Sequence, residues 1–229
     1  MKSMSRLLTI SILAVGGCCV APSAKVTSGE GRGLEQVRGV QDTDILIIRH
    51  AEKPESGPGL SPAGQARADA YVRWFKDLST SSRSLAPDYL VAGADSERSW
   101  RPRLTLEPLS RAMGIPIDLR FASDRSQELA ETLRTKKHGR CILVCWRHGT
   151  IPAFLSALGA DPIKLLPDGK WPEEEFGLLL DLRFDQKAHL VSAEIKQLPQ
   201  ARITGFSSVV YRKCLDILSS HFPLFPLRP

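Results

Sequence analysis

Short apolar runs alternate along the chain with segments in which apolar residues recur every three or four positions. The runs at Asp44–Ile48, Asp88–Ala92 and Cys141–Trp146 have the length of buried β-strands. Two further runs, Phe176–Phe184 and His189–Lys196, flank a polar turn and predict a pair of strands late in the chain. We therefore expect strands at all of these positions, with helices between the first three.

The first predicted helix begins at Ser61 and Pro62, because Ser is a preferred N-cap and Pro is favoured in the first helical turn. It is expected to run to about Leu78, with one face made of Ala66, Ala70, Trp74 and Leu78. Further helices are predicted at Pro102–Met113, Ser126–Lys137 and Ile151–Leu158, with Gly114 and Gly159 placed to end the first and the last of these.

Strands that alternate with helices indicate an α/β fold, here a three-layer α/β/α sandwich around a mainly parallel central sheet. In such sheets ligands bind beyond the carboxyl ends of the strands. Arg49 and His50 follow the first predicted strand, Arg101 follows the second through a loop, and Arg147 and His148 follow the third. The sequence therefore predicts a site for an anion, built from cationic and imidazole side chains at one edge of the sheet.

Residues 1–17 predict an export signal that is not part of the fold. Lys2 and Arg6 precede an apolar stretch over Leu7–Val15, which is too short to span a bilayer as a helix. The segment 15–18 (VGGC) resembles a bacterial lipobox and predicts a lipid on Cys18.

Simple secretory cleavage after Ala21 or Ala24 is the alternative to lipidation. Residues 18–43 are rich in Gly, Ser and charge and are expected to tether a domain at 44–229 to the membrane. In either case the protein is expected to be exported to the cell envelope or periplasm.

The composition is that of an ordinary globular protein and excludes a disordered tail protein: 42% of the 229 residues are hydrophobic and 24% are charged. The net charge of +6 falls by two once Lys2 and Arg6 leave with the signal. So small a surplus does not require a nucleic acid partner, and it suits a small anionic substrate.

Cysteine spacing gives no indication of a metal site, because no Cys-x-x-Cys occurs and no histidines are spaced around the cysteines. Cys141 and Cys145 are expected to lie on the same face of their strand as buried thiols. A disulfide to the remote Cys214 is left open.

Four segments, met in order along the chain, resemble the motifs of the histidine phosphatase superfamily, also called phosphoglycerate-mutase-like. Residues 49–54 (RHAEKP) resemble the first-histidine motif of a bacterial branch, and 59–67 (GLSPAGQAR) resemble the helix start that follows it. Residues 99–109 (SWRPRLTLEPL) resemble the second arginine motif, and 144–149 (VCWRHG) the second histidine motif. The similarity covers about residues 44–185, and the order and spacing of the motifs make it specific.

The resemblance implies a phosphoglycerate-mutase-like fold and a histidine acid-type phosphatase that needs no metal and no cofactor. In the family the first-motif histidine carries the phosphoryl group, a role that falls on His50. Arg49 and Arg101 match the two phosphate-binding arginines, and His148 matches the histidine that donates to a phosphoryl oxygen. Lys53 is expected either to bind the substrate anion or to face solvent.

The general acid that protonates the leaving group is not marked by a recognisable motif. The family commonly places a Glu two to three dozen residues after the second arginine, and Glu128 lies in that window, as do Asp124 and Glu131. Glu52 is expected either to take part in catalysis or to orient its own loop.

Two features depart from the family pattern and leave the substrate undefined. Arg147, directly before His148, adds positive charge near the phosphate site. Residues 171–177 (WPEEEFG) resemble bacterial members but lack the Asp expected after Phe176. The predicted partners are a small phosphorylated substrate and, through the lipid anchor, a membrane. The alternative function is a non-catalytic envelope lipoprotein that binds a phosphorylated ligand.

Overall fold

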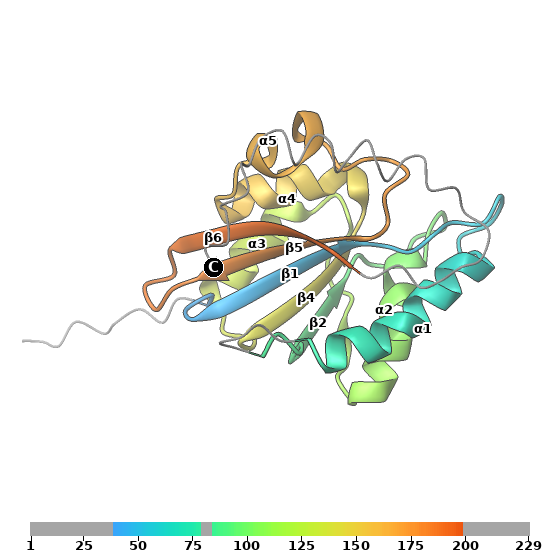
Figure 1. Cartoon of the computed structure of the whole chain (residues 1–229), viewed down its shortest axis with the longest axis horizontal. Helices are drawn as coiled ribbons and strands as arrows, with labels where there is room; N and C mark the ends of the chain where they lie inside the picture. Colours follow the sequence, from blue (N-terminus) through green and yellow to red (C-terminus); the bar gives the residue numbers. More distant parts are fainter. Residues whose placement is uncertain (1–38, 79–83, 199–229) are drawn as a thin grey trace, which may run out of the picture. The chain divides into compact units, whose positions relative to one another are not determined.

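Strand β1 (Thr43–Arg49) is buried along its whole length inside a six-stranded sheet. The computed structural model describes residues 39–78 and 84–198. The strand order is β3-β2-β4-β1-β5-β6, with β2 at Tyr89–Ala92, β3 at Ile117–Asp118, β4 at Cys141–Trp146, β5 at Leu178–Phe184 and β6 at Leu190–Gln197. Strands β1 to β4 pair in parallel, whereas β5 pairs antiparallel with β1 and β6 antiparallel with β5 (Figure 1). The mainly parallel sheet is confirmed.

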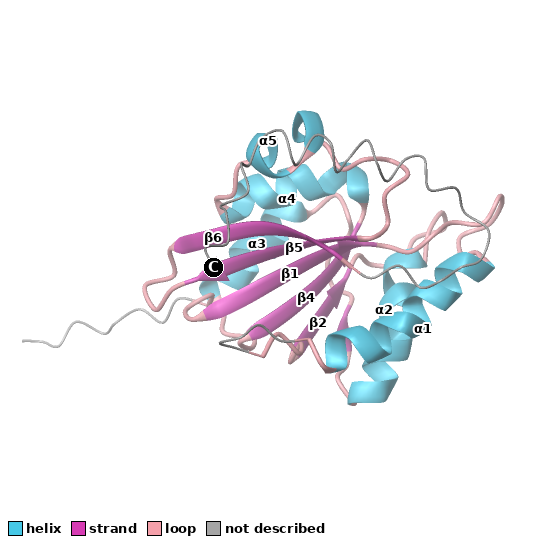
Figure 2. Cartoon of the chain, in the orientation of Figure 1, coloured by secondary structure: helices cyan, strands magenta, loops and turns pink. Residues whose placement is uncertain are grey.

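Helices cover both faces of this sheet, so the three-layer α/β/α prediction is confirmed (Figure 2). Helices α1 (Pro62–Lys76) and α2 (Arg101–Met113) pack on one face, and α3 (Ser126–Thr135) and α4 (Ile151–Leu158) pack on the other. Two 3-10 turns and a short helix complete the described elements: η1 (His148–Thr150), α5 (Pro162–Leu165) and η2 (Pro167–Gly169).

The two faces of β1 explain why its sequence is continuously apolar. Successive side chains of a strand point to opposite faces. Leu46 and Ile48 therefore belong to the core beneath α1 and α2, and Ile45 and Ile47 to the core beneath α3 and α4. A strand covered on both faces has no solvent-facing side and needs no polar alternation.

The predicted helix ends are confirmed by their local geometry. The Ser61 hydroxyl accepts a hydrogen bond from the Gly64 backbone N–H at 3.0 Å and so caps α1. Gly114 and Gly159 end α2 and α4 in the left-handed conformation, with φ of 68° and 89°.

The predicted face of α1 is only partly the buried one. Ala70 is buried and Trp74 and Leu78 pack against the core, but Ala66 is exposed. The most deeply buried stripe consists of Ala68, Tyr71 and Phe75. Two neighbouring stripes of this helix are apolar enough to be buried, and helical periodicity does not choose between them. Packing selects the stripe with two aromatic rings in direct line, because rings bury the most apolar area.

The fold begins before Asp44, since Val40 and Thr43 are already buried. The predicted signal, most of the predicted tether and Cys214 lie outside the described residues. Cys141 and Cys145 are buried on the α1–α2 face of β4, as predicted. In residues 39–78 and 84–198 no helix combines the length and the apolar character that crossing a bilayer requires.

Candidate active site

The carboxyl ends of β1, β2 and β4 lie at one edge of the sheet, because these neighbouring strands are parallel. Arg49 ends β1 and His50 follows it, while His148 follows β4 and Arg101 begins α2 after the loop that leaves β2. The rings of His50 and His148 lie edge to face, with centroids 6.5 Å apart. The four side chains that the sequence singled out are therefore brought together.

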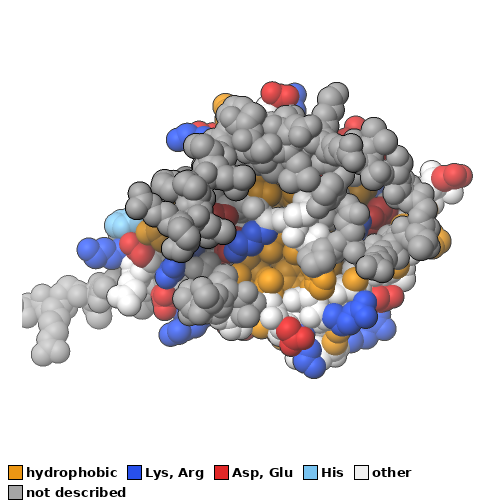
Figure 3. Space-filling model, in the orientation of Figure 1, with side chains coloured by type: hydrophobic (Ala, Val, Ile, Leu, Met, Phe, Trp, Pro, Cys, Tyr) orange, Lys and Arg blue, Asp and Glu red, His pale blue; other side chains and the backbone are white. Residues whose placement is uncertain are grey.

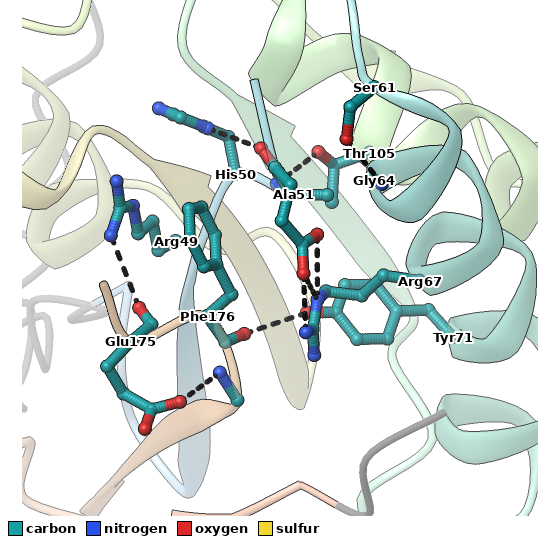
Figure 4. A network of polar contacts seen from close by, with 12 residues as sticks. Arg49, His50, Ala51, Ser61, Gly64, Arg67, Tyr71, Thr105, Glu175 and Phe176 are labelled. Atoms are coloured by element: carbon teal, nitrogen blue, oxygen red, sulfur yellow. Dashed lines mark hydrogen bonds and ion pairs between the residues drawn. The ribbon is translucent and has the colours of Figure 1, made fainter. Parts of the chain in front are cut away.

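His50 is almost fully buried and has a defined tautomer. Its Nδ1 lies 2.8 Å from the carbonyl oxygen of Ala51 (Figure 4). A carbonyl only accepts, so Nδ1 carries the proton and Nε2 keeps its lone pair. Burial lowers the His50 pKa to about 4, and the charges of Arg49 and Arg101 act in the same direction. At neutral pH the side chain is an uncharged imidazole with a nucleophilic Nε2.

This environment sets an expected pH dependence. The folded-state pKa of His50 lies below the ordinary value of 6.5, at about 4. Between those values the unfolded chain binds a proton that native His50 does not, so the free energy of unfolding should fall as pH falls through this window. Nitrogen NMR of labelled histidine should show His50 neutral at pH of about 5.5, with its proton on Nδ1. A cationic His50 at that pH would contradict this assignment.

Arg49 is held by the segment 171–177. Its Nη1 donates to the backbone carbonyl of Glu173 and, at 3.3 Å, to that of Glu175, and its guanidinium carbon lies 3.9 Å from the centre of the Phe176 ring (Figure 4). Its buried Nε has no hydrogen-bond partner among the described residues. Burial lowers the Arg49 pKa to about 10, which leaves the side chain charged at neutral pH.

The direction of β5 explains why this segment reaches Arg49. Because β5 runs antiparallel to β1, the start of β5 lies at the same edge of the sheet as the end of β1. The segment 171–177 directly precedes β5 and so lies against the site. Trp171 stabilises the conformation of this segment, because its Nε1 donates to the carbonyl of Glu175 at 2.7 Å. The sequence showed that this segment departs from the family pattern but did not predict its contact with Arg49. The aromatic residues Trp171 and Phe176 are the feature by which the sequence marks it.

Arg101, at the start of α2, lies close enough to His50 for its charge to act on that ring. Its Nη1 and Nη2 donate to the carbonyls of Gly57 and Arg98, each at 3.3 Å, and its buried Nε has no partner within the described residues. Arg103, two residues further along α2, is instead paired with Asp95 at 2.8 Å. Burial and the nearby charge of Arg147 both lower the pKa of Arg101.

Helix α2 is fastened to the loop after His50 by one hydroxyl. Thr105 Oγ1 accepts from the Ala51 backbone N–H at 2.9 Å and donates to the Arg101 carbonyl at 2.7 Å (Figure 4). Thr105 is fully buried, so this link is protected from water. It fixes the position of Arg101 relative to His50.

Glu52 is bonded to α1 through Arg67. Its two carboxylate oxygens accept from Arg67 on α1, with Nη2 to Oε1 at 2.6 Å and Nε to both oxygens at 3.0 Å. A Cβ on Gly64 would lie 2.5 Å from the Glu52 carbonyl oxygen, so α1 approaches this closely only because residue 64 is glycine. The pair neutralises Arg67 and anchors the loop, in contrast to Arg49 and Arg101, which have no carboxylate ion-pair partner in the described chain.

His148 and Lys53 complete the cationic and imidazole set. His148 is half-buried, and its Nδ1 has no hydrogen-bond partner among the residues described. Burial lowers the His148 pKa, and the positive charges of Arg49 and Lys53 contribute to the shift. Lys53 is exposed but close enough for its charge to act on His148. A neutral His148 still has one N–H with which to donate.

The structure separates the three candidate acids. Glu128 and Glu131 lie on the exposed side of α3, and Glu128 forms an ion pair with Arg125 at 3.6 Å. No contact in the described chain joins either of them to the histidine pair. Asp124 instead lines a cavity of about 220 Å³ together with Arg147, the residue before His148.

The positive charge of this site comes from side chains. Within the described ranges there is no group of three or more His, Cys, Asp or Glu residues that could bind a metal ion. On the face that Figure 3 shows, Lys and Arg side chains are interspersed with Asp and Glu side chains.

Neither a family model nor a curated protein matches this sequence, but solved structures do. SixA from Agrobacterium tumefaciens is 20% identical over 66% of this chain and 96% of that one, with a TM-score of 0.44. A phosphoglycerate mutase from Plasmodium falciparum is 15% identical over 72% and 96%, with a TM-score of 0.45. A mycobacterial glucosyl-3-phosphoglycerate phosphatase is 14% identical over 69% and 99%, with a TM-score of 0.43. At these values the function has to be inferred from the site itself.

Proposed function

We propose that the protein is a phosphomonoester hydrolase of the histidine phosphatase type, which acts through a phosphorylated His50 and without a metal. One observation carries this proposal. A neutral His50, with its Nε2 lone pair available, lies beside the buried Arg49 and the half-buried Arg101, and neither guanidinium forms an ion pair with a carboxylate of the described chain. The carboxylates of four glutamates act on Arg49 from a distance without contacting it. A buried cation without a contacting partner is costly, and a phosphoryl dianion is a ligand of the right sign.

In the first step His50 Nε2 attacks the phosphorus of the bound ester. A nitrogen–phosphorus bond forms, the bond from phosphorus to the ester oxygen breaks, and that oxygen takes a proton from a carboxylic acid. In the second step water attacks phosphorus, the nitrogen–phosphorus bond breaks, and the proton of the water returns to the carboxylate. Inorganic phosphate leaves, and His50 is again neutral.

The arginines supply the charge that this transfer needs. Backbone carbonyls fix each guanidinium in place: Arg49 Nη1 donates to that of Glu175, and Arg101 Nη1 and Nη2 donate to those of Gly57 and Arg98. Arg49 Nη2 makes no hydrogen bond within the described chain, so it is left to donate to the phosphoryl oxygens. Donors that are fixed before the reaction do not reorganise during it, which is the most effective form of electrostatic stabilisation. His148, whose ring centre lies 6.5 Å from that of His50, adds one neutral N–H donor.

The test is hydrolysis of p-nitrophenyl phosphate by the purified domain in the presence of a chelator. We expect turnover that the chelator does not change, because the guanidiniums stand where a metal would otherwise neutralise the phosphate. Complete loss with chelator would contradict the metal-independent mechanism. Phosphate binding without turnover on a broad panel of phosphoesters would instead support the ligand-binding lipoprotein.

We assign the general acid to Asp124, since it alone of the three candidates lines the same cavity as Arg147, the residue that precedes His148. Asp124→Asn should lower kcat by about 10²-fold on an alkyl phosphate, whose leaving group needs a proton. On p-nitrophenyl phosphate, whose leaving group departs as an anion, the loss should be small. Steady-state kinetics on both substrates measure this difference. A leaving-group-dependent loss in Glu128→Gln instead would contradict the assignment.

A further inference from the structure

Phe176 lies against the proposed phosphate site but belongs to neither hydrophobic core of the described chain. Its side chain is half-buried, and the Arg49 guanidinium carbon lies over its ring at 3.9 Å from the ring centre (Figure 4). A cation this close to the face of an aromatic ring is attracted by the negative charge of that face. The ring therefore interacts with Arg49 more than with the core.

The backbone around Phe176 is held on both sides. The carbonyl of Glu175 accepts from Trp171 Nε1 at 2.7 Å, and the Glu175 carboxylate accepts from the Gly177 N–H at 2.6 Å. The Phe176 carbonyl accepts from the hydroxyl of Tyr71, a buried residue of α1, at 3.5 Å. These contacts fix the backbone from which the ring projects.

A second guanidinium, that of Arg67, lies 6.0 Å from the centre of the same ring. Its charge is already neutralised by Glu52, whose carboxylate it contacts at 2.6 Å. Arg49 lies closer to the ring and forms no ion pair with a carboxylate of the described chain. The ring therefore acts mainly on Arg49.

A ring and a carboxylate hold a guanidinium in different ways. The N–H groups of a guanidinium lie in its plane, where a carboxylate or a phosphate binds them. An aromatic ring binds the flat face and uses none of these N–H groups. Since the carbonyls of the segment 171–177 accept only from Nη1 of Arg49, the ring can hold this side chain and still leave Nη2 for the substrate.

We propose that Phe176 is a positioning residue for catalysis: the face of its ring holds the Arg49 guanidinium in the orientation that presents Nη2 to the phosphoryl group. This inference rests on the proposed function and deepens it, because it gives the segment 171–177 the task of aligning a phosphate-binding arginine. Phe176 acts through Arg49 and does not itself contact the substrate.

The experiment measures the Kd of inorganic phosphate by calorimetry for proteins that carry a fluorinated phenylalanine at position 176. Fluorine withdraws negative charge from the ring face with little change in ring size, so one, two and three fluorines should weaken phosphate binding step by step. Phe176→Leu, which removes the ring, should weaken it by about tenfold. The kcat/KM for p-nitrophenyl phosphate should fall in the same order.

Phe184 is the matched control. It lies at the other end of β5, its ring is buried, and no cation of the described chain lies over it. The same fluorinated residues at position 184 should leave the Kd unchanged. Thermal unfolding checks that each variant is folded, and the fluorinated series decides the question if Phe176→Leu does not fold.

The possible failures are distinguishable. If fluorination at position 176 leaves phosphate binding unchanged, the ring at most fills space and the inference is wrong, even where Phe176→Leu loses affinity, while the proposed function stands. Equal weakening by fluorine at positions 176 and 184 would also refute the inference. If the protein neither binds phosphate nor hydrolyses any ester, the proposed function fails. NMR of labelled arginine then decides whether Phe176 holds Arg49: rotation of that guanidinium should become faster with each fluorine at position 176, and an unchanged rate refutes the hold.

Discussion

Replacing His50 with alanine is expected to lower kcat/KM for p-nitrophenyl phosphate by about 10⁴-fold or more. Without Nε2 no nitrogen–phosphorus bond forms, and direct attack by water has to replace two easier steps with one difficult step. The wild-type protein, quenched during turnover with a labelled phosphate ester, should carry phosphate that is lost in acid and kept in base. This behaviour is typical of phosphohistidine, and His50→Ala should carry no such label.

The matched control for this experiment is His189→Ala. His189 is an exposed histidine beside the turn between β5 and β6, where it contacts Asp185 at 3.6 Å. Its loss should leave both the rate and the label unchanged. Thermal unfolding of His50→Ala separates a chemical effect from an unfolded protein, since His50 is nearly fully buried. Equal activity of folded His50→Ala and wild-type protein would refute the proposed mechanism.

Replacing Arg49 is expected to produce the second largest loss, about 10³-fold in kcat/KM for Arg49→Ala and about 10²-fold for Arg49→Lys. Lysine keeps the charge but not the planar fork, so it cannot donate to the phosphate while also donating to the carbonyls of Glu173 and Glu175. A loss for lysine close to that for alanine would show that fork geometry matters more than charge. Steady-state kinetics with thermal unfolding as a fold check measure both effects.

Arg183→Gln is the control for the Arg49 variants. Arg183 lies on β5 opposite Asp44, at the other end of β1, and its side chain is exposed. Its removal takes away one positive charge from the same strand pair without touching the site. If Arg183→Gln loses as much activity as Arg49→Ala, the effect reflects net charge and not a bound phosphate. Phe176→Leu extends the test, because loss of the ring should weaken the hold on Arg49 without removing its charge.

The sequence predicted most elements of this fold because their signals are local. The apolar run at 44–48, the Ser61 cap and the glycines at 114 and 159 each depend on residues a few positions away. A helix end is fixed by which side chain or backbone conformation satisfies the nearest N–H and C=O groups. The buried face of α1 depends on the sheet and on α2, which lie far away in sequence, and there the prediction is only partly right, since Ala70 is buried but Ala66 is exposed.

For the site, the sequence predicts which side chains meet: parallel strands put Arg49, His50 and His148 at one edge, and Arg101 follows from its motif. The partners of those side chains become known only from the packed fold. The tautomer of His50, the carbonyls that hold Arg49 and the separation of Asp124 from Glu128 all depend on contacts between distant segments. The two kinds of interaction differ in how far apart in sequence the interacting residues lie. Backbone preference and periodicity act over a few residues, whereas burial, charge and hydrogen bonding act between whatever residues the packed chain brings together.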